Sequence, residues 1–113
     1  MKPREKEDFV RKRLEEMFGE LLLKRRLIIG YDSRKFPKIH EFDLVSVDGE
    51  IVGEITSTRK DEYKAVVNCY YLTRVQAKKK ILALTDTEFY SFFKSKYDGV
   101  LPKDIEILLV RVI

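Results

Sequence analysis

The feature that most constrains the fold of this chain is a pair of apolar, β-branched runs separated by an Asp-Gly dipeptide. The runs cover residues 42–47 and 50–58, and Asp48 and Gly49 lie between them. An Asp-Gly pair flanked by two such runs is the strongest short-range signal for a β-hairpin. The sequence therefore predicts two antiparallel strands joined by a two-residue loop.

A two-residue loop also fixes which residues of the hairpin face one another. It places Val45 opposite Val52 and, on the same face, Asp43 opposite Glu54. Thr56 lies one step beyond Glu54, because side chains alternate along a strand. Like charges directly across a strand pair destabilise it. A divalent cation held by both carboxylates would remove this repulsion, whereas on a solvated face the repulsion would be tolerated. The hairpin alone leaves both interpretations open.

The composition indicates one soluble globular domain covering residues 1–113. Hydrophobic residues make up 44% and charged residues 37% of the chain, enough for a core and a densely charged surface. No apolar run approaches the roughly 20 residues that a membrane span needs, so we expect no membrane partner. The charged N-terminal segment lacks the apolar centre of a signal peptide, and Cys69 is the one cysteine. We therefore expect a cytoplasmic protein without disulfides.

The charge balance is mildly basic. There are 23 Lys and Arg against 19 Asp and Glu, a formal net charge of +4 and a pI of about 9.1. This balance permits a polyanionic partner without requiring one. The densest basic cluster is Lys24-Arg25-Arg26, which we interpret first as the solvated end of a helix and second as a binding patch.

Apolar residues at helical spacing predict three helices, at residues 2–26, 59–76 and 87–97. The first has an apolar stripe with charged residues elsewhere. The third has an aromatic stripe, which is more typical of a core than of a base-stacking surface. Its members are Phe89, Phe92, Phe93 and Tyr97.

Besides the hairpin, three apolar runs predict strands at residues 27–31, 80–84 and 105–113. The last run is apolar on both faces, which favours a central or covered strand. The element order is α-β-β-β-α-β-α-β. Helices between the later strands imply an α/β fold, in which helices flank both faces of a central mixed five-stranded sheet.

The hairpin carries a recognisable phrase. Residues 40–46 read H-E-F-D-L-V-S and residues 51–55 read I-V-G-E-I. An acid on each hairpin strand, followed by a helix on a mixed sheet, resembles the PD-(D/E)XK nuclease superfamily, which includes archaeal Holliday-junction resolvases. The phrase is similar to an uncharacterised branch with H-x-F-D-L-V-S followed by E-x-K. The resemblance implies a restriction-endonuclease-like fold.

The resemblance also implies a site. Asp43 matches the motif aspartate and Glu54 the motif acid, which in the family bind Mg²⁺ or Mn²⁺. Such a metal positions the scissile phosphate and lowers the pKa of a bound water. Nucleases of this type often present a further glutamate from the N-terminal helix, and Glu20 is our candidate for that third metal ligand.

One position departs from the family pattern. The motif lysine would lie two residues after Glu54, where this chain has Thr56. A threonine hydroxyl can donate a hydrogen bond but supplies no positive charge to the transition state. Lys60, Lys64 or Arg59 could reach back toward the site. Arginine would serve as a phosphate clamp but not in proton transfer. We take Thr56 and Lys60 as the candidate catalytic residues beside the two acids.

Two functions from different classes follow. The first is a metal-dependent DNA endonuclease, expected to be a homodimer because so small a domain offers little surface for gripping a duplex. The second is a catalytically inactive nuclease-fold protein that binds nucleic acid or another protein. The Asp43/Glu54 pair favours the first, and Thr56 favours the second. A purely structural role for both acids, without metal or nucleic acid, remains as a third interpretation.

Overall fold

The computed structural model describes residues 2–57 and 61–112. In chain order its elements are α1 (Pro3–Phe18), β1 (Leu22–Tyr31), β2 (Pro37–Ser46), β3 (Ile51–Thr56), α2 (Glu62–Thr73), β4 (Lys79–Leu84), α3 (Thr87–Lys96) and β5 (Ile105–Leu109). The predicted order of helices and strands is confirmed. No helix in the described part of the chain has both the length and the apolar character needed to cross a membrane.

The five strands form one mixed sheet in which spatial order follows sequence order, β1-β2-β3-β4-β5. The β1–β2 and β2–β3 pairs are antiparallel, and the β3–β4 and β4–β5 pairs are parallel. The two parallel connections contain α2 and α3, because a parallel pair needs a long crossover. The predicted mixed five-stranded sheet is therefore confirmed.

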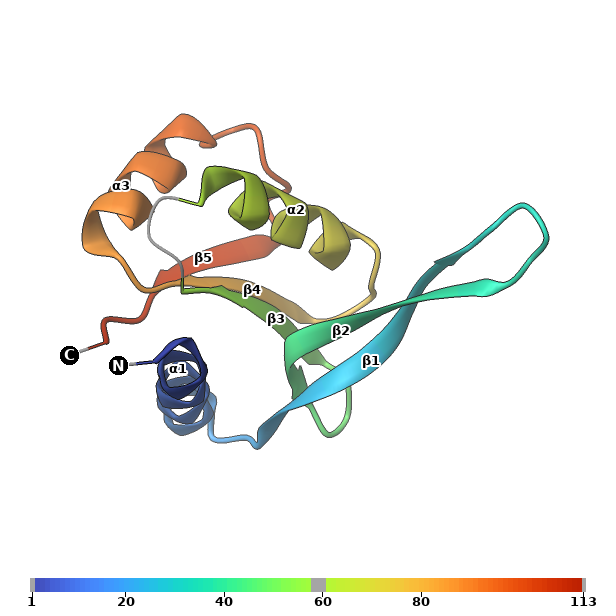
Figure 1. Cartoon of the computed structure of the whole chain (residues 1–113), viewed down its shortest axis with the longest axis horizontal. Helices are drawn as coiled ribbons and strands as arrows, with labels where there is room; N and C mark the ends of the chain where they lie inside the picture. Colours follow the sequence, from blue (N-terminus) through green and yellow to red (C-terminus); the bar gives the residue numbers. More distant parts are fainter. Residues whose placement is uncertain (1, 58–60, 113) are drawn as a thin grey trace.

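Helices cover both faces of the sheet, α1 on one face and α2 with α3 on the other (Figure 1). β3 and β4 lie between these layers and are buried almost throughout, which explains their continuous apolar sequences. The core correspondingly forms two clusters. The cluster under α1 contains Val10, Leu14, Leu22, Leu44, Ile51, Ile55, Ile81, Ala83 and Val110. The cluster under α2 and α3 includes Phe42, Val45, Val52, Cys69, Leu72, Leu82, Leu84, Phe89 and Phe93.

The prediction of a first helix over residues 2–26 is wrong at its C-terminal end. The helix ends at Phe18, where Gly19 adopts a left-handed conformation (φ 67°) and donates its N–H to the carbonyl oxygen of Glu15. Leu22 then begins β1, so the basic cluster of residues 24–26 lies in a strand. Leu22 continues the helical spacing of the apolar stripe of α1. In the structure it lies in β1 instead and is fully buried in the core cluster under α1.

The hairpin of β2 and β3 has the predicted register but a wider loop. Val45 pairs with Val52 as expected. The loop comprises residues 47–50, and within it Gly49 (φ 74°) donates its N–H to the carbonyl oxygen of Ser46 over 2.9 Å. The Ser46 hydroxyl also accepts the N–H of Ile51. A side chain thus completes the turn that we expected from two residues alone.

An irregularity in β2 interrupts the alternation of its side chains. Phe42 and Val45 both belong to the cluster under α2 and α3, whereas Leu44 lies in the cluster under α1. A regular strand would place Phe42 and Leu44 on one face. The pairing of β2 with β1 shifts at the same place, as at a β-bulge. The alternation is thus interrupted between Phe42 and Leu44, next to Asp43.

The remaining elements differ from expectation mainly at their ends. α2 and α3 begin after Asp61 and Asp86, whose carboxylates accept backbone N–H groups at the helix N-termini. Residues 58–60, predicted as part of β3 and α2, lie outside the described residues. β5 ends at Leu109 and is an edge strand, not a central one. Its side chains are mostly half-buried.

Gly53 permits the close approach of β3 to its neighbours. A Cβ atom there would lie 3.0 Å from the carbonyl oxygen of Ile81 and 3.0 Å from Cδ1 of Leu44. We expect Gly53→Ala to lower the free energy of unfolding by about 1–3 kcal/mol, because neither neighbour can move freely in a packed sheet. Urea denaturation measures this change, and an unchanged stability would show that β3 has room to shift.

Candidate active site

The carboxylates of Asp43 and Glu54 lie together where the hairpin strands part. Leu44 and Gly53 form the last backbone pair on the side toward the acids. Beyond it each acid accepts a backbone N–H from the other strand. Oδ2 of Asp43 accepts from Ile55 over 2.8 Å, and Oε1 of Glu54 accepts from Asp43 over 3.1 Å. The carboxylates thus replace carbonyl groups at the end of the ladder, which offsets part of their repulsion.

His40 holds the second oxygen of Glu54. Its Nε2 lies 3.1 Å from Oε2 of Glu54. The imidazole ring stacks on Tyr71 of α2, with ring centres 3.7 Å apart, and meets the edge of Phe42 at 4.7 Å. His40 is thus a hydrogen-bond partner of Glu54 inside the candidate site.

Burial changes the proton affinities of this group. Burial, and then the charge of Asp43, raise the pKa of Glu54 to about 8. Burial likewise raises the pKa of Asp43, although the N–H of Ile55 opposes the rise. The pKa of His40 is lowered by burial, against the opposing charges of Asp43 and Glu41. At neutral pH Glu54 therefore holds its proton to a large extent, which ordinary glutamates do not.

The glutamate that α1 directs toward the acids is Glu7, which the sequence analysis missed. Its charge contributes to the raised pKa values of both Asp43 and Glu54. Glu20, our candidate, follows the end of α1 and is exposed. Glu15, in the last turns of α1, accepts the N–H of Leu22 and so holds the start of β1. Glu7 sits one residue from Asp8 on a densely charged surface, and no local pattern distinguishes it.

Three cations surround the acids. Lys64, in the first turn of α2, lowers the pKa of both carboxyl groups, and Lys24 of β1 lowers that of Asp43. Lys24 also pairs with Glu7 over 3.5 Å. Arg11 of α1 donates to the carbonyl oxygen of Asp43 over 3.3 Å. Lys60 and Arg59 lie outside the described residues, so Lys64 is the cation after β3 that the structure places near the site.

Thr56 is buried, and its side chain makes a structural hydrogen bond. Its hydroxyl accepts a hydrogen bond from Nδ2 of Asn68 in α2 over 3.0 Å. This bond fixes the end of β3 to the helix that covers it. Thr56 therefore contributes no charge to the acids, and positive charge comes from neighbours such as Lys64 and Lys24.

The described side chains offer a pair of metal ligands and no complete cage. Among residues 2–57 and 61–112, no three His, Cys, Asp or Glu side chains form a group that could hold a metal ion. Mg²⁺ is commonly bound by one or two carboxylates, with water and phosphate oxygens filling its other positions. Oδ2 of Asp43 accepts the N–H of Ile55, which leaves Oδ1 to bind a metal ion. The donor set fits this kind of site.

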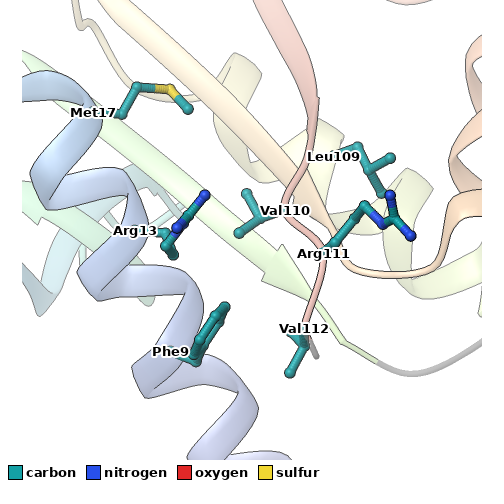
Figure 2. Close-up of a pocket in the computed structure, with 7 residues that line it drawn as sticks. All are labelled: Phe9, Arg13, Met17, Leu109, Val110, Arg111 and Val112. Carbon is teal, nitrogen blue, oxygen red and sulfur yellow. The ribbon is translucent and has the colours of Figure 1, made fainter.

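A groove of the described surface lies between α1 and the chain that follows β5. It has a volume of about 520 Å³ and is lined by Phe9, Arg13 and Met17 of α1 and by the chain at and after the end of β5. Figure 2 shows Phe9 and Val112 on its two sides, with Arg13 between the helix and Val110. It contains neither Asp43 nor Glu54. This groove is therefore separate from the candidate site.

Comparison of the chain with models of known families, with curated proteins and with solved structures found no match in any of the three.

Proposed function

We propose that this protein is a Mg²⁺- or Mn²⁺-dependent nuclease that hydrolyses phosphodiester bonds of DNA, with Asp43 and Glu54 as the metal ligands. The observation that supports this proposal is the pair of carboxylates drawn together at the end of the β2–β3 ladder. Burial raises the pKa of both carboxyl groups, so their ionised forms need a nearby positive charge. A divalent cation is the partner that would supply it.

When bound, the metal would polarise the phosphate and supply a hydroxide nucleophile. The chain's own residues have separate tasks. Glu54 must release its proton to bind a cation, and Nε2 of His40, 3.1 Å from Oε2, holds the carboxyl group in position. Lys64 supplies positive charge near the acids, in place of the lysine that Thr56 replaces. Lys60 stays a candidate for the same task.

Asparagine in place of Asp43 tests the proposal directly. The amide oxygen can still accept the N–H of Ile55, so the fold is retained while one ligand charge is lost. We expect the wild type to bind Mn²⁺ and to cut supercoiled, single-stranded or branched DNA, and Asp43→Asn to do neither. Glu106→Gln, an exposed acid on β5, is the matched control and should behave as the wild type.

Either of two results would refute the nuclease proposal. One is a wild type that neither binds Mn²⁺ nor cuts any of the three substrates. The other is Asp43→Asn that retains both properties. The contact between Thr56 and Asn68 favours the second candidate, an inactive nuclease-fold protein that binds nucleic acid. Binding of DNA without any cutting, in the presence of Mn²⁺, would support that candidate.

A further inference from the structure

The ends of β1 and β2 form a projecting hairpin, which we call the basic arm and define as residues 24–41. Figure 1 shows it extending beyond the helices on both faces of the sheet. Two-stranded ribbons of this kind lack a core of their own. The arm is nevertheless anchored to α2 partway along its length, because Nε of Arg74 donates to the carbonyl oxygen of Ile29 over 3.0 Å.

The basic arm carries the net charge of the whole protein. It contains six lysine and arginine residues and two acids, a net charge of +4. The complete chain also has a net charge of +4, so the remaining residues sum to zero. Two of the arm's cations form exposed ion pairs within it, Arg26 with Glu41 at 4.0 Å and Lys38 with Asp32 at 3.8 Å. Exposed pairs of this kind are weak.

A hydrogen-bond network orders the tip of the arm without burying it. Oδ1 of Asp32 accepts the N–H groups of Arg34 and Phe36, each over 2.9 Å. The carbonyl oxygen of Asp32 accepts the N–H of Lys35, which has a left-handed backbone (φ 68°). The tip thus presents two cations on a fixed turn, and the Arg34 guanidinium lies over the Phe36 ring at 5.5 Å.

Large apolar side chains alternate with these cations and are exposed. Tyr31 and Phe36 at the tip are 65% and 58% exposed, and Ile28 and Ile39, which face each other across the strands, are 49% and 57% exposed. Several large apolar side chains exposed on one short hairpin are typical of a surface that binds a partner. Such a partner would have to accept both apolar contact and a concentrated positive charge.

We infer that the basic arm enters a groove of duplex DNA, its cations contacting phosphates and its tip aromatics contacting bases or sugars. A two-stranded β-ribbon fits the major groove, where apolar side chains can contact the methyl groups of thymine. A second copy of the chain fits less well, since two arms of the same positive charge would repel. The inference rests on the proposed function in that DNA is the proposed substrate.

The geometry connects the arm to the candidate site. His40 belongs to the arm and contacts Glu54, so the arm rises directly from the two acids. A duplex held along the arm would therefore pass the acids at the arm's base. This arrangement also supplies the gripping surface for which we expected a homodimer.

Binding to a short duplex, measured by fluorescence anisotropy in EDTA, tests the inference apart from catalysis. The test variant is Arg34→Gln/Lys35→Asn, because asparagine tolerates the left-handed backbone of residue 35. The control is Lys12→Gln/Lys103→Gln, which removes the same charge at exposed positions outside the arm. We expect about tenfold weaker binding or more for the test variant alone, and a salt slope reduced by about 0.9 per lost phosphate contact.

Equal weakening in both double variants, or wild-type affinity in the arm variant, would overturn the inference. Sedimentation of the same samples adds a second readout. If the arm variants dissociate a dimer while DNA binding is unchanged, the arm is a self-association surface and the inference is wrong. Arm-dependent binding by a protein that cuts nothing would leave the inference standing and refute only the nuclease. Cutting of DNA that does not depend on the arm would support the nuclease proposal and refute the inference.

Discussion

Glutamine at position 54 is expected to remove a loss of stability that the wild type suffers as the pH rises from 6.5 to 8. The pKa of Glu54 is about 8 in the folded protein, against 4.5 for an ordinary glutamate. Between these values the folded state binds more protons than the unfolded state, so the free energy of unfolding falls as pH rises. The slope approaches about 1.4 kcal/mol per pH unit. The wild type should therefore lose about 1–2 kcal/mol over this window.

Glutamine isolates this effect because its amide can serve the same two neighbours. Its oxygen can accept the N–H of Asp43, and its NH₂ can donate to Nε2 of His40. Alanine would instead leave the N–H of Asp43 without an acceptor, which costs about 1–3 kcal/mol. Burial lowers the pKa of His40, so the linkage of this histidine makes the stability rise with pH, opposite in sign to the effect of Glu54.

Urea denaturation of wild type and Glu54→Gln across pH 6.5 to 8 measures the difference, first in EDTA and then with millimolar Mn²⁺. The metal should restore the stability of the wild type at pH 8, because a ligand that binds only the folded state stabilises it. It should not affect the variant. Parallel pH profiles for the two proteins would show that Glu54 ionises normally. A Mn²⁺ effect of equal size in both would contradict the assigned ligand.

The second large effect is expected for Phe93→Ala. Phe93 is fully buried under the sheet and contacts two other aromatic rings, Phe89 with ring centres 5.7 Å apart and Tyr97 at 4.6 Å. Truncation leaves a cavity that these rings cannot fill without leaving their own positions. We expect the free energy of unfolding to fall by about 3–5 kcal/mol, measured by urea denaturation at pH 6.5.

Phe92→Ala is the matched control, one residue away on the same helix. Phe92 is 47% exposed, so its truncation should cost at most about 1 kcal/mol. The aromatic stripe that predicted the core face of this helix included both residues. Equal losses for the two variants would mean that Phe92 is covered in solution, for example by a second copy of the chain.

Some features of this protein follow from the sequence alone, because they depend on interactions between residues close together in the chain. The Asp48-Gly49 turn and the alternation after it predicted the pairing of Val45 with Val52, and helical spacing placed α3 to within one residue. The continuous apolar runs of β3 and β4 reflect burial on both faces. Element order then implied the parallel half of the sheet, because a crossover helix leaves few other arrangements.

The tertiary structure decided the rest, because the deciding contacts join residues distant in sequence. Leu22 has helical spacing but is a strand residue, since the sheet buries it more fully than a longer α1 would. The bulge in β2 beside Asp43, whose carboxylate accepts the N–H of Ile55, lies where the pairing with β1 shifts. Glu7 approaches the acids only because α1 packs across the sheet. The sequence determined which acids stand on the hairpin. Packing determined what surrounds them, and with it their charge.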